Sequence, residues 1–429
     1  MRQLIVTSVM IGLAAGAAGA EEAPPPKTLS QCVAIAIEQH PSLKAAAASV
    51  EAGHARVWEA AAPYLPQITA QYGAQRRQTN SAAFGSPTGQ PFRSYFYNMG
   101  ASLTQVLFDF GQTLDSIRSA QAAEQSLQAD LSTQLAAVVL NLKQSYFTLL
   151  ANRRLLGVAD ETVHQNQKHL EQAEGRFNVG LAAKIDVTTA QVQLANAELN
   201  QVTARNNVAV ARETLRNALG LSGPLDFDIV DNLDVHRVTI TEDEALAAAY
   251  NLRPELQSIV AHERATIEQI GALQKSYLPS VQAKADYNYL GIDYPLVNTW
   301  DFGATVTLPI MSGGLTTAQI AEQKANLANL KSNEEVERQD IALEVRQAVL
   351  NLAQAAESIR VSEKGLQQAR ENLDLAEGRY NTGVGNIIEL TDAQASLTTA
   401  EASYVQALYN YKTTIAALEK ATAKQLESD

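Results

Sequence analysis

Residues 174–180 read Glu-Gly-Arg-Phe-Asn-Val-Gly, and 203 positions later residues 377–383 read Glu-Gly-Arg-Tyr-Asn-Thr-Gly. A repeat with a period near 200 residues is too long for a solenoid, whose units are far shorter. The chain is therefore predicted to contain two copies of one structural unit, in residues 21–223 and residues 224–429.

Around these two stretches the sequence is strongly helical. All 13 prolines lie outside residues 113–223 and 314–429, and both windows are rich in Ala, Leu, Gln, Glu and Lys, which are good helix formers. Each window is interrupted once by a turn containing glycine, at 178–183 and at 381–385. Helices are predicted over residues 28–62, 113–177, 185–219, 242–276, 315–379 and 386–423. The longest would run for roughly 95 Å at 1.5 Å per residue.

Two segments follow a different period, and each begins after Tyr-Leu-Pro, at residues 64–66 and 277–279. In the second copy apolar residues alternate with polar ones, namely Val281, Ala283, Ala285, Tyr287 and Tyr289 with Gln282, Lys284, Asp286 and Asn288. Such alternation over about ten residues is typical of a membrane β-strand. β-Hairpins are predicted at 67–108 and 280–310. One such hairpin would also suit a soluble protein that buries its apolar face on a helix, but two matched hairpins favour a barrel.

The first twenty residues have the pattern of a secretory signal peptide. Arg2 precedes an apolar stretch, and Ala18-Gly19-Ala20 is a small-x-small cleavage site. We expect cleavage after Ala20 and export of the rest. The lone Cys32 cannot form an internal disulfide, and we interpret it as a small buried apolar residue.

Charge and motifs exclude several classes of function. The net charge of −13 argues against nucleic acid as a partner, because binding it requires a basic face. The six histidines are scattered, and no metal-ligand cluster, phosphate-binding glycine loop or catalytic constellation is found. We therefore expect no enzyme activity, no metal site and no cofactor.

The predicted strands impose an assembly. Four strands per chain cannot close a barrel, and open strand edges are not tolerated in lipid. Three chains would supply twelve strands, enough to leave an aqueous lumen. Eight strands would make the smallest common closed barrel, which side chains fill. The expected fold is mainly α with a transmembrane β part, in which the four strands of each chain join those of other copies and the long helices continue the wall.

The twofold repeat, the two Tyr-Leu-Pro signals and the turns at 176–181 and 379–384 together resemble the TolC family of outer-membrane efflux and secretion channels. The resemblance covers essentially the whole mature chain. It implies a location in the Gram-negative outer membrane, in contact with outer-membrane lipid and extending into the periplasm. It also implies a homotrimer in which four strands per chain close as a 12-stranded β-barrel above a long α-helical coiled-coil barrel. This trimer would be the exit duct of a tripartite efflux pump or type I secretion system, with a periplasmic adaptor protein and an inner-membrane pump as partners.

The resemblance assigns a periplasmic gate to the second helical turn. Glu389 and Asp392 match acidic residues that ring the closed tip; three residues apart, they share one helix face. Acids also suit the first turn of any helix. Asp186 and Tyr380 match positions that link neighbouring coils. A basic residue common in the family is replaced here by Gly385, so the locking contacts should differ.

The resemblance also assigns docking to the tips of the two turns. Gly180, Leu181, Gly383 and Val384 match the surface that meets the adaptor, although both glycines would also serve to end a helix. One alternative remains open for the whole chain, a periplasmic coiled-coil adaptor or scaffold of an export complex that never enters the membrane. It would share the long helices but lack the paired hairpins.

Overall fold

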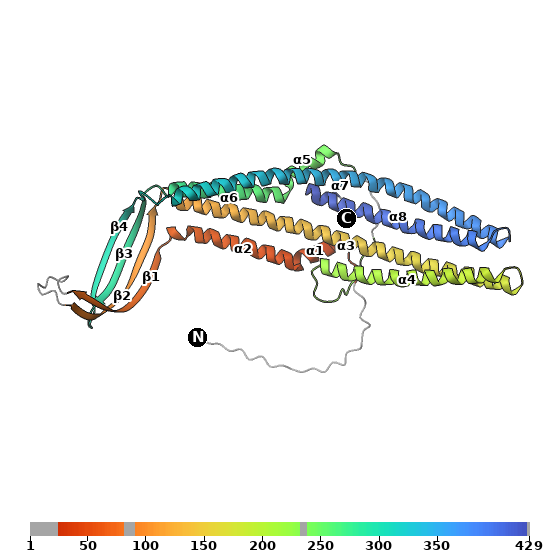
Figure 1. Ribbon diagram of the computed structural model, residues 1–429, viewed down its shortest axis with the longest axis horizontal. Helices are drawn as coiled ribbons and strands as arrows, with labels where there is room; N and C mark the ends of the chain where they lie inside the picture. Colours follow the sequence, from red (N-terminus) through yellow and green to blue (C-terminus); the bar gives the residue numbers. More distant parts are fainter. Residues whose placement is uncertain (1–24, 81–90, 232–237, 427–429) are drawn as a thin grey trace, which may run out of the picture.

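The computed structural model describes residues 25–80, 91–231 and 238–426, which form an elongated body with a β-sheet at one end (Figure 1). The predicted signal peptide at 1–20 lies outside the described residues. The elements are α1 (Leu29–Gln39), α2 (Pro41–Ala61), a 3-10 turn η1 (Ala62–Tyr64), β1 (Gln67–Asn80), β2 (Pro91–Phe108), α3 (Gln112–Asn178), α4 (Lys184–Ala218), α5 (Glu242–Leu252), α6 (Pro254–Lys275), β3 (Ser280–Gly291), β4 (Val297–Thr307), α7 (Leu315–Asn381) and α8 (Ile387–Thr422).

The two longest helices, α3 and α7, contain 67 residues each, so each extends for roughly 100 Å. Each begins after a glycine in the left-handed region, Gly111 at φ 82° and Gly314 at φ 84°, where other residues would be strained. Each returns through a helix of about half its length, α4 with 35 residues and α8 with 36. The four helices predicted for these windows are confirmed to within a few residues.

The predictions of single helices over 28–62 and 242–276 were wrong, because each is broken in two. His40 precedes Pro41 with ψ 123°, and Arg253 precedes Pro254 with ψ 125°. A residue before proline is pushed out of the helical region, whereas proline itself fits the first position of a new helix. The products are α1 and α2 in the first copy, and α5 and α6 in the second.

The shorter helices lie end to end beside the long ones and together match their length. α2 and α4 lie one after the other along α3, and α6 and α8 lie one after the other beside α3 and α7 (Figure 1). α1 and α5 lie near the two junctions. The largest clusters of buried side chains are here, around Tyr146 and Leu142 in one cluster and Tyr411 and Ile341 in the other. The middle of the molecule is therefore its main apolar core.

The sheet has the strand order β1-β2-β3-β4, with every neighbouring pair antiparallel. The central β2–β3 pairing joins the two sequence copies. Its register places the apolar residues of all four strands on one face: Tyr72 opposite Met99, Met99 opposite Tyr289, and Ala285 opposite Phe302. Phe302 is 77% exposed on this face. The predicted hairpins and their alternating faces are confirmed over the described residues.

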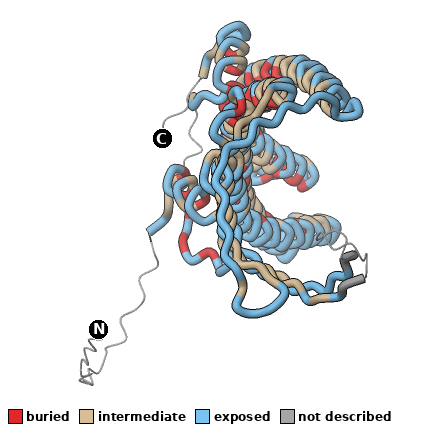
Figure 2. The backbone as a smooth tube through the Cα atoms, turned by 90° about the vertical axis from the view of Figure 1, so that its left-hand side faces the viewer, coloured by how far each residue is buried: buried red, intermediate tan, exposed pale blue. Residues whose placement is uncertain are grey.

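Viewed along the long axis, the elements follow an open curve rather than surrounding one solid core (Figure 2). Exposed apolar side chains remain on α4, such as Leu199 and Val202, and on α7, such as Leu343 and Leu350. α4 and α7 form the two lateral margins of the curve, since α3 and α8 contact each other between them. Among the described residues, no helix is long and apolar enough to cross a membrane.

Candidate gate at the paired helical turns

The two turns singled out in the sequence lie side by side at the end of the molecule farthest from the sheet (Figure 1). One joins α3 to α4 and the other joins α7 to α8. We call these two turns, with the last helical residues of α3 and α7 and the first of α4 and α8, the helical tip. It contains every residue that the sequence predicted for a gate or for docking.

Both turns end their helices in the same way. Gly180 has φ 76°, and its N–H bonds to the carbonyl of Phe177, while the N–H of Leu181 bonds to the carbonyl of Arg176. Gly383, with φ 77°, and Val384 repeat the pattern. These paired bonds form a Schellman motif, which requires a left-handed residue after the helix and therefore favours glycine. The predicted role of the two glycines in helix termination is confirmed.

Arg176 connects the two hairpins at the tip. It lies in the last turn of α3, and its Nη1 donates a hydrogen bond of 2.9 Å to the backbone carbonyl of Tyr380 in α7. Its guanidinium also lies 4.9 Å from the centre of the Tyr380 ring, within the range of a cation–π interaction. One turn away, Gln172 of α3 donates to the Asn381 side chain at 2.5 Å. The sequence analysis did not identify Arg176, although it lies within the repeated motif.

Tyr380 faces the interior of its own protomer. Its side chain is 4% exposed, and its hydroxyl has no hydrogen-bond partner among the described residues. Burial raises the pKa of Tyr380; the Arg176 charge opposes this shift and the Asp186 carboxylate adds to it. The structure thus brings together Tyr380 and Asp186, two predicted link residues, with Arg176 between the hairpins.

Glu389 is held within the second hairpin. Its carboxylate accepts a hydrogen bond of 2.8 Å from Nε of Arg379, near the end of α7. Its own N–H donates to the side chain of Asn386, which caps α8, at 2.8 Å. The glycine at 385 follows from this geometry, because an added Cβ would lie 3.0 Å from Cβ of Arg379. A side chain here would have to displace the arginine that Glu389 uses.

The remaining predicted acids are less engaged. Asp392 lies one turn beyond Glu389 on α8, is exposed, and forms no ion pair among the residues that the structure describes. Asp186 lies in the first turn of α4 and accepts a hydrogen bond from the N–H of Ala183 at 3.2 Å. Both acids therefore also fit the favourable interaction of a carboxylate with a helix N-terminus.

The outermost surface of the tip is apolar. Leu181 is 70% exposed and Val384 is 71% exposed, and Val179 and Ile185 beside them are similarly uncovered. Large apolar side chains gathered at one exposed end are typical of a protein-binding surface. The predicted docking residues Gly180, Leu181, Gly383 and Val384 all lie here.

Further from the tip, His169 is buried between the hairpins. It projects from α3, is 5% exposed, and its Nε2 has no hydrogen-bond partner among the described residues. Gln394 of α8 is also 5% exposed and contributes to the lining of the same hollow. Burial lowers the pKa of His169, while the Glu377 charge and the nearby Gln394 side chain act in the opposite sense. Because the sequence shows only scattered histidines, this inter-hairpin position could not be inferred from spacing.

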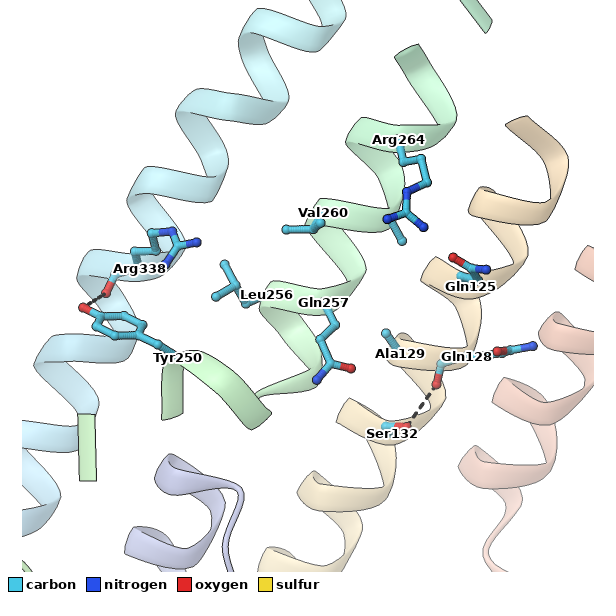
Figure 3. Close-up of a pocket in the computed structure, with 11 residues that line it drawn as sticks. Gln125, Gln128, Ala129, Ser132, Tyr250, Leu256, Gln257, Val260, Arg264 and Arg338 are labelled. Atoms are coloured by element: carbon cyan, nitrogen blue, oxygen red, sulfur yellow. Dashed lines mark hydrogen bonds between the residues drawn. The ribbon is translucent and has the colours of Figure 1, made fainter. Parts of the chain in front are cut away.

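A separate hollow of about 500 Å³ lies between α3 and α6, far from the tip (Figure 3). Its walls carry Gln125, Gln128 and Gln257 with the side chains of Arg264 and Arg338. Arg338 is already engaged by Glu334 at 2.7 Å. Within the described ranges, no three His, Cys, Asp or Glu side chains are grouped so that they could hold a metal ion.

Comparison with known proteins agrees with this architecture. The chain is 27% identical over 392 residues to outer membrane protein TolC of Escherichia coli strain K12, covering 87% of this chain and 77% of that protein. It is 23% identical to TolC of Vibrio cholerae, covering 94% and 92%. Among solved structures, the CmeC outer membrane channel of Campylobacter jejuni superposes with a TM-score of 0.81 at 19% identity, covering 94% and 87% of the two chains.

The family comparison covers both sequence copies. The family model described as outer membrane efflux protein matches residues 33–221 and 245–424. Channels of this kind are homotrimers of the Gram-negative outer membrane, extend into the periplasm, and work with periplasmic adaptor proteins and inner-membrane pumps. The relatives are channel proteins rather than enzymes. Because this family model matches most of the chain, the chain belongs to the outer membrane efflux protein family.

Proposed function

We propose that three copies of this chain form the outer-membrane exit duct of an efflux pump and that the helical tip is its periplasmic gate. The sheet supplies four strands from each copy to a 12-stranded barrel, and the long helices continue the wall into the periplasm. Transport through such a duct requires no catalytic group, so we also propose that the chain has no enzyme activity.

The observation that supports a gate at the tip is the connection through Arg176. α3 with α4 and α7 with α8 form two separate hairpins, and at their far end the described polar contacts between them come from Arg176 and Gln172. These are hydrogen bonds and a cation–π contact, which can break and re-form without unfolding a core. A hairpin that swings outward would lose these contacts and widen the entrance.

We further propose that Glu389 and Asp392 form the constriction. In a threefold assembly they would give six carboxylates around one axis, and rings of acidic side chains favour cations. Arg379 neutralises part of this charge through Glu389, which leaves Asp392 as the exposed acid. Leu181 and Val384 are then placed on the outer end, where an adaptor protein would dock.

The contact that Arg176 forms between the two hairpins can be tested by conductance in planar lipid bilayers. Arg176→Ala removes the hydrogen bond and the cation–π contact, together worth about 2 kcal/mol. In a two-state gate this favours the open form by roughly 30-fold. We expect larger and longer-lived openings, with the same cation preference as the native trimer.

Arg264→Ala is the matched control, because Arg264 belongs to α6, which lies near the sheet and far from the tip (Figure 1). It should leave conductance unchanged. If Arg176→Ala conducts like the native trimer although it folds and inserts, Arg176 does not hold the gate closed.

A further inference from the structure

A cavity of about 640 Å³ lies at the middle of the protomer, far from both the sheet and the tip. α3 forms its floor, the start of α6 lies on one side, and the end of α8 lies on the other, with α1 beside them. Because α3 and α8 lie between the lateral margins formed by α4 and α7, a neighbouring copy that packs on those margins would leave the cavity uncovered. Its volume is typical of a small-molecule site.

One wall of the cavity is apolar. Leu29 and Phe147 are buried in it, and Val33, Leu135 and Leu140 are partly buried around them. These side chains come from α1 and α3, which also contribute Ser30, Ser132 and Lys143 to the lining. An apolar chain that enters the cavity would be removed from water along this wall.

Positive charge lies mainly on the α8 side. Lys412, Lys420 and Lys424 contribute to the lining there, and Lys143 is added from α3, against the single carboxylate of Glu419. This excess is local, because the whole chain has a net charge of −13. Lys412 is 5% exposed and lies inside the protein, whereas Lys424 is exposed.

Each carboxylate near these lysines already forms an ion pair with one or more basic side chains. Glu419 accepts from Lys143 at 2.5 Å. Glu344, behind the cavity, accepts from Lys420 at 2.9 Å and also from Arg253 at 2.6 Å. An ammonium group has three N–H donors, so Lys420 retains donors after bonding to Glu344. Lys424 is exposed at the rim, where it can meet an incoming anion.

We propose that this cavity binds a long-chain carboxylate, a free fatty acid. Its head would lie between Lys420 and Lys424 at the end of α8, and its chain would lie along the wall formed by α1 and α3. An anion with an apolar tail matches both halves of the cavity. The neighbouring hollow of Figure 3 shares Ser132 and Gln257 with the cavity.

The proposal can be tested by photo-crosslinking in outer membranes that contain the full chain. A hexadecanoic acid carrying a diazirine on its chain is added and irradiated, and labelled peptides are identified by mass spectrometry. Labelling of β1–β4 by probe in the bilayer reports that the protein is folded and inserted. We expect additional labelling on α3 around residues 135–140, displaced by hexadecanoic acid and much less by hexadecanol.

Two variants make the test specific. Lys424→Glu should reduce the α3 labelling by about tenfold, through loss of one charged hydrogen bond, and Val139→Trp should abolish it by filling the cavity. Lys324→Glu, an exposed lysine on α7, should change nothing. If α3 is not labelled while the strands are, if hexadecanol competes as well as the acid, or if Lys424→Glu binds normally, the proposal is wrong.

Discussion

Arg176 and Arg379 occupy the same position in the two copies and yet have different partners. Arg176 reaches across to the backbone of Tyr380 on the other hairpin, whereas Arg379 stays within its own hairpin and bonds to Glu389. The repeated sequence therefore supplies one contact between the hairpins and one inside the second hairpin. Only the first would have to break when the hairpins separate.

Gly385 provides a test of how tightly the second turn is packed. An alanine there would place Cβ 3.0 Å from Arg379 Cβ and 3.1 Å from Tyr380 N. We expect Gly385→Ala to lower the free energy of unfolding by about 1–3 kcal/mol, the usual cost of overpacking. The shift in thermal midpoint of the trimer, followed by circular dichroism, measures this effect.

Gly378→Ala is the matched control for that change. Gly378 lies inside α7, and an added Cβ would meet nothing within 4 Å. Alanine in a helix is more favourable than glycine by up to about 1 kcal/mol, so this variant should be as stable as the native protein or more so. Equal midpoints for the two variants would contradict the close packing at Gly385.

At the residue scale, the sequence predicted the backbone better than the side-chain contacts. The glycines of both turns were recognisable because helix termination leaves a local signature, which their positive φ confirms. The bond from Arg379 to Glu389 and the contact of Arg176 with Tyr380 depend on how two hairpins pack. The first pair is separated by 10 positions in the sequence and the second by 204. Nothing in the sequence indicates that either pair will be in contact.

At the scale of elements, two prolines set helix boundaries that the hydrophobic pattern does not indicate. The pattern runs through residues 28–62 and 242–276 without interruption, which predicted one helix in each. Pro41 and Pro254 nevertheless end one helix and begin the next. The long helices were predicted well because their windows contain no proline and their hydrophobic spacing extends over many turns.

The contact between the two hairpins should depend on pH through His169. Burial holds the pKa of His169 below its ordinary value of 6.5, so the imidazole is neutral between the hairpins. As pH falls below 6.5, the unfolded chain binds this proton first and stability is lost. The loss amounts to at most about 1.4 kcal/mol per pH unit and stops once the folded-state pKa is passed.

His169→Gln isolates this effect, because glutamine is polar and does not titrate in this range. Glu377, Asp374, Glu171, Glu401 and Lys168 around the same hollow remain in both proteins and contribute equally to the background. Thermal midpoints between pH 8 and pH 5 should fall more steeply for the native trimer than for the variant. Parallel curves would show that His169 does not couple the hairpins to pH.

At the scale of the whole molecule, the sheet places large apolar side chains on one exposed face. Phe302 lies near the middle of β4 on this face, whereas Thr305 of the same strand lies on the polar face. If the apolar face meets lipid, Phe302→Lys should cost about 2–4 kcal/mol, the range for a lysine near the middle of the bilayer.

Thr305→Lys is the control, since it would add the same charge to the lumen side. Trimer yield in the outer-membrane fraction, with heat resistance of the trimer on gels, should fall for Phe302→Lys and not for Thr305→Lys. The reverse order would mean that the sheet faces the membrane with its polar side. A periplasmic scaffold would tolerate both changes and would leave the membrane in a carbonate wash.

The most direct test of a gated duct is the ion conductance of the purified trimer in planar bilayers, beside a Glu389→Ala/Asp392→Ala double variant. We predict stable, cation-preferring steps in the native protein and a weaker cation preference in the variant. The bond that this change removes, from Arg379 to Glu389, lies within one hairpin, so the frequency of openings should stay that of the native trimer. A folded, inserted trimer whose cation preference ignores the double change would contradict a constriction at Glu389 and Asp392, and a folded sample without conductance would contradict the duct itself.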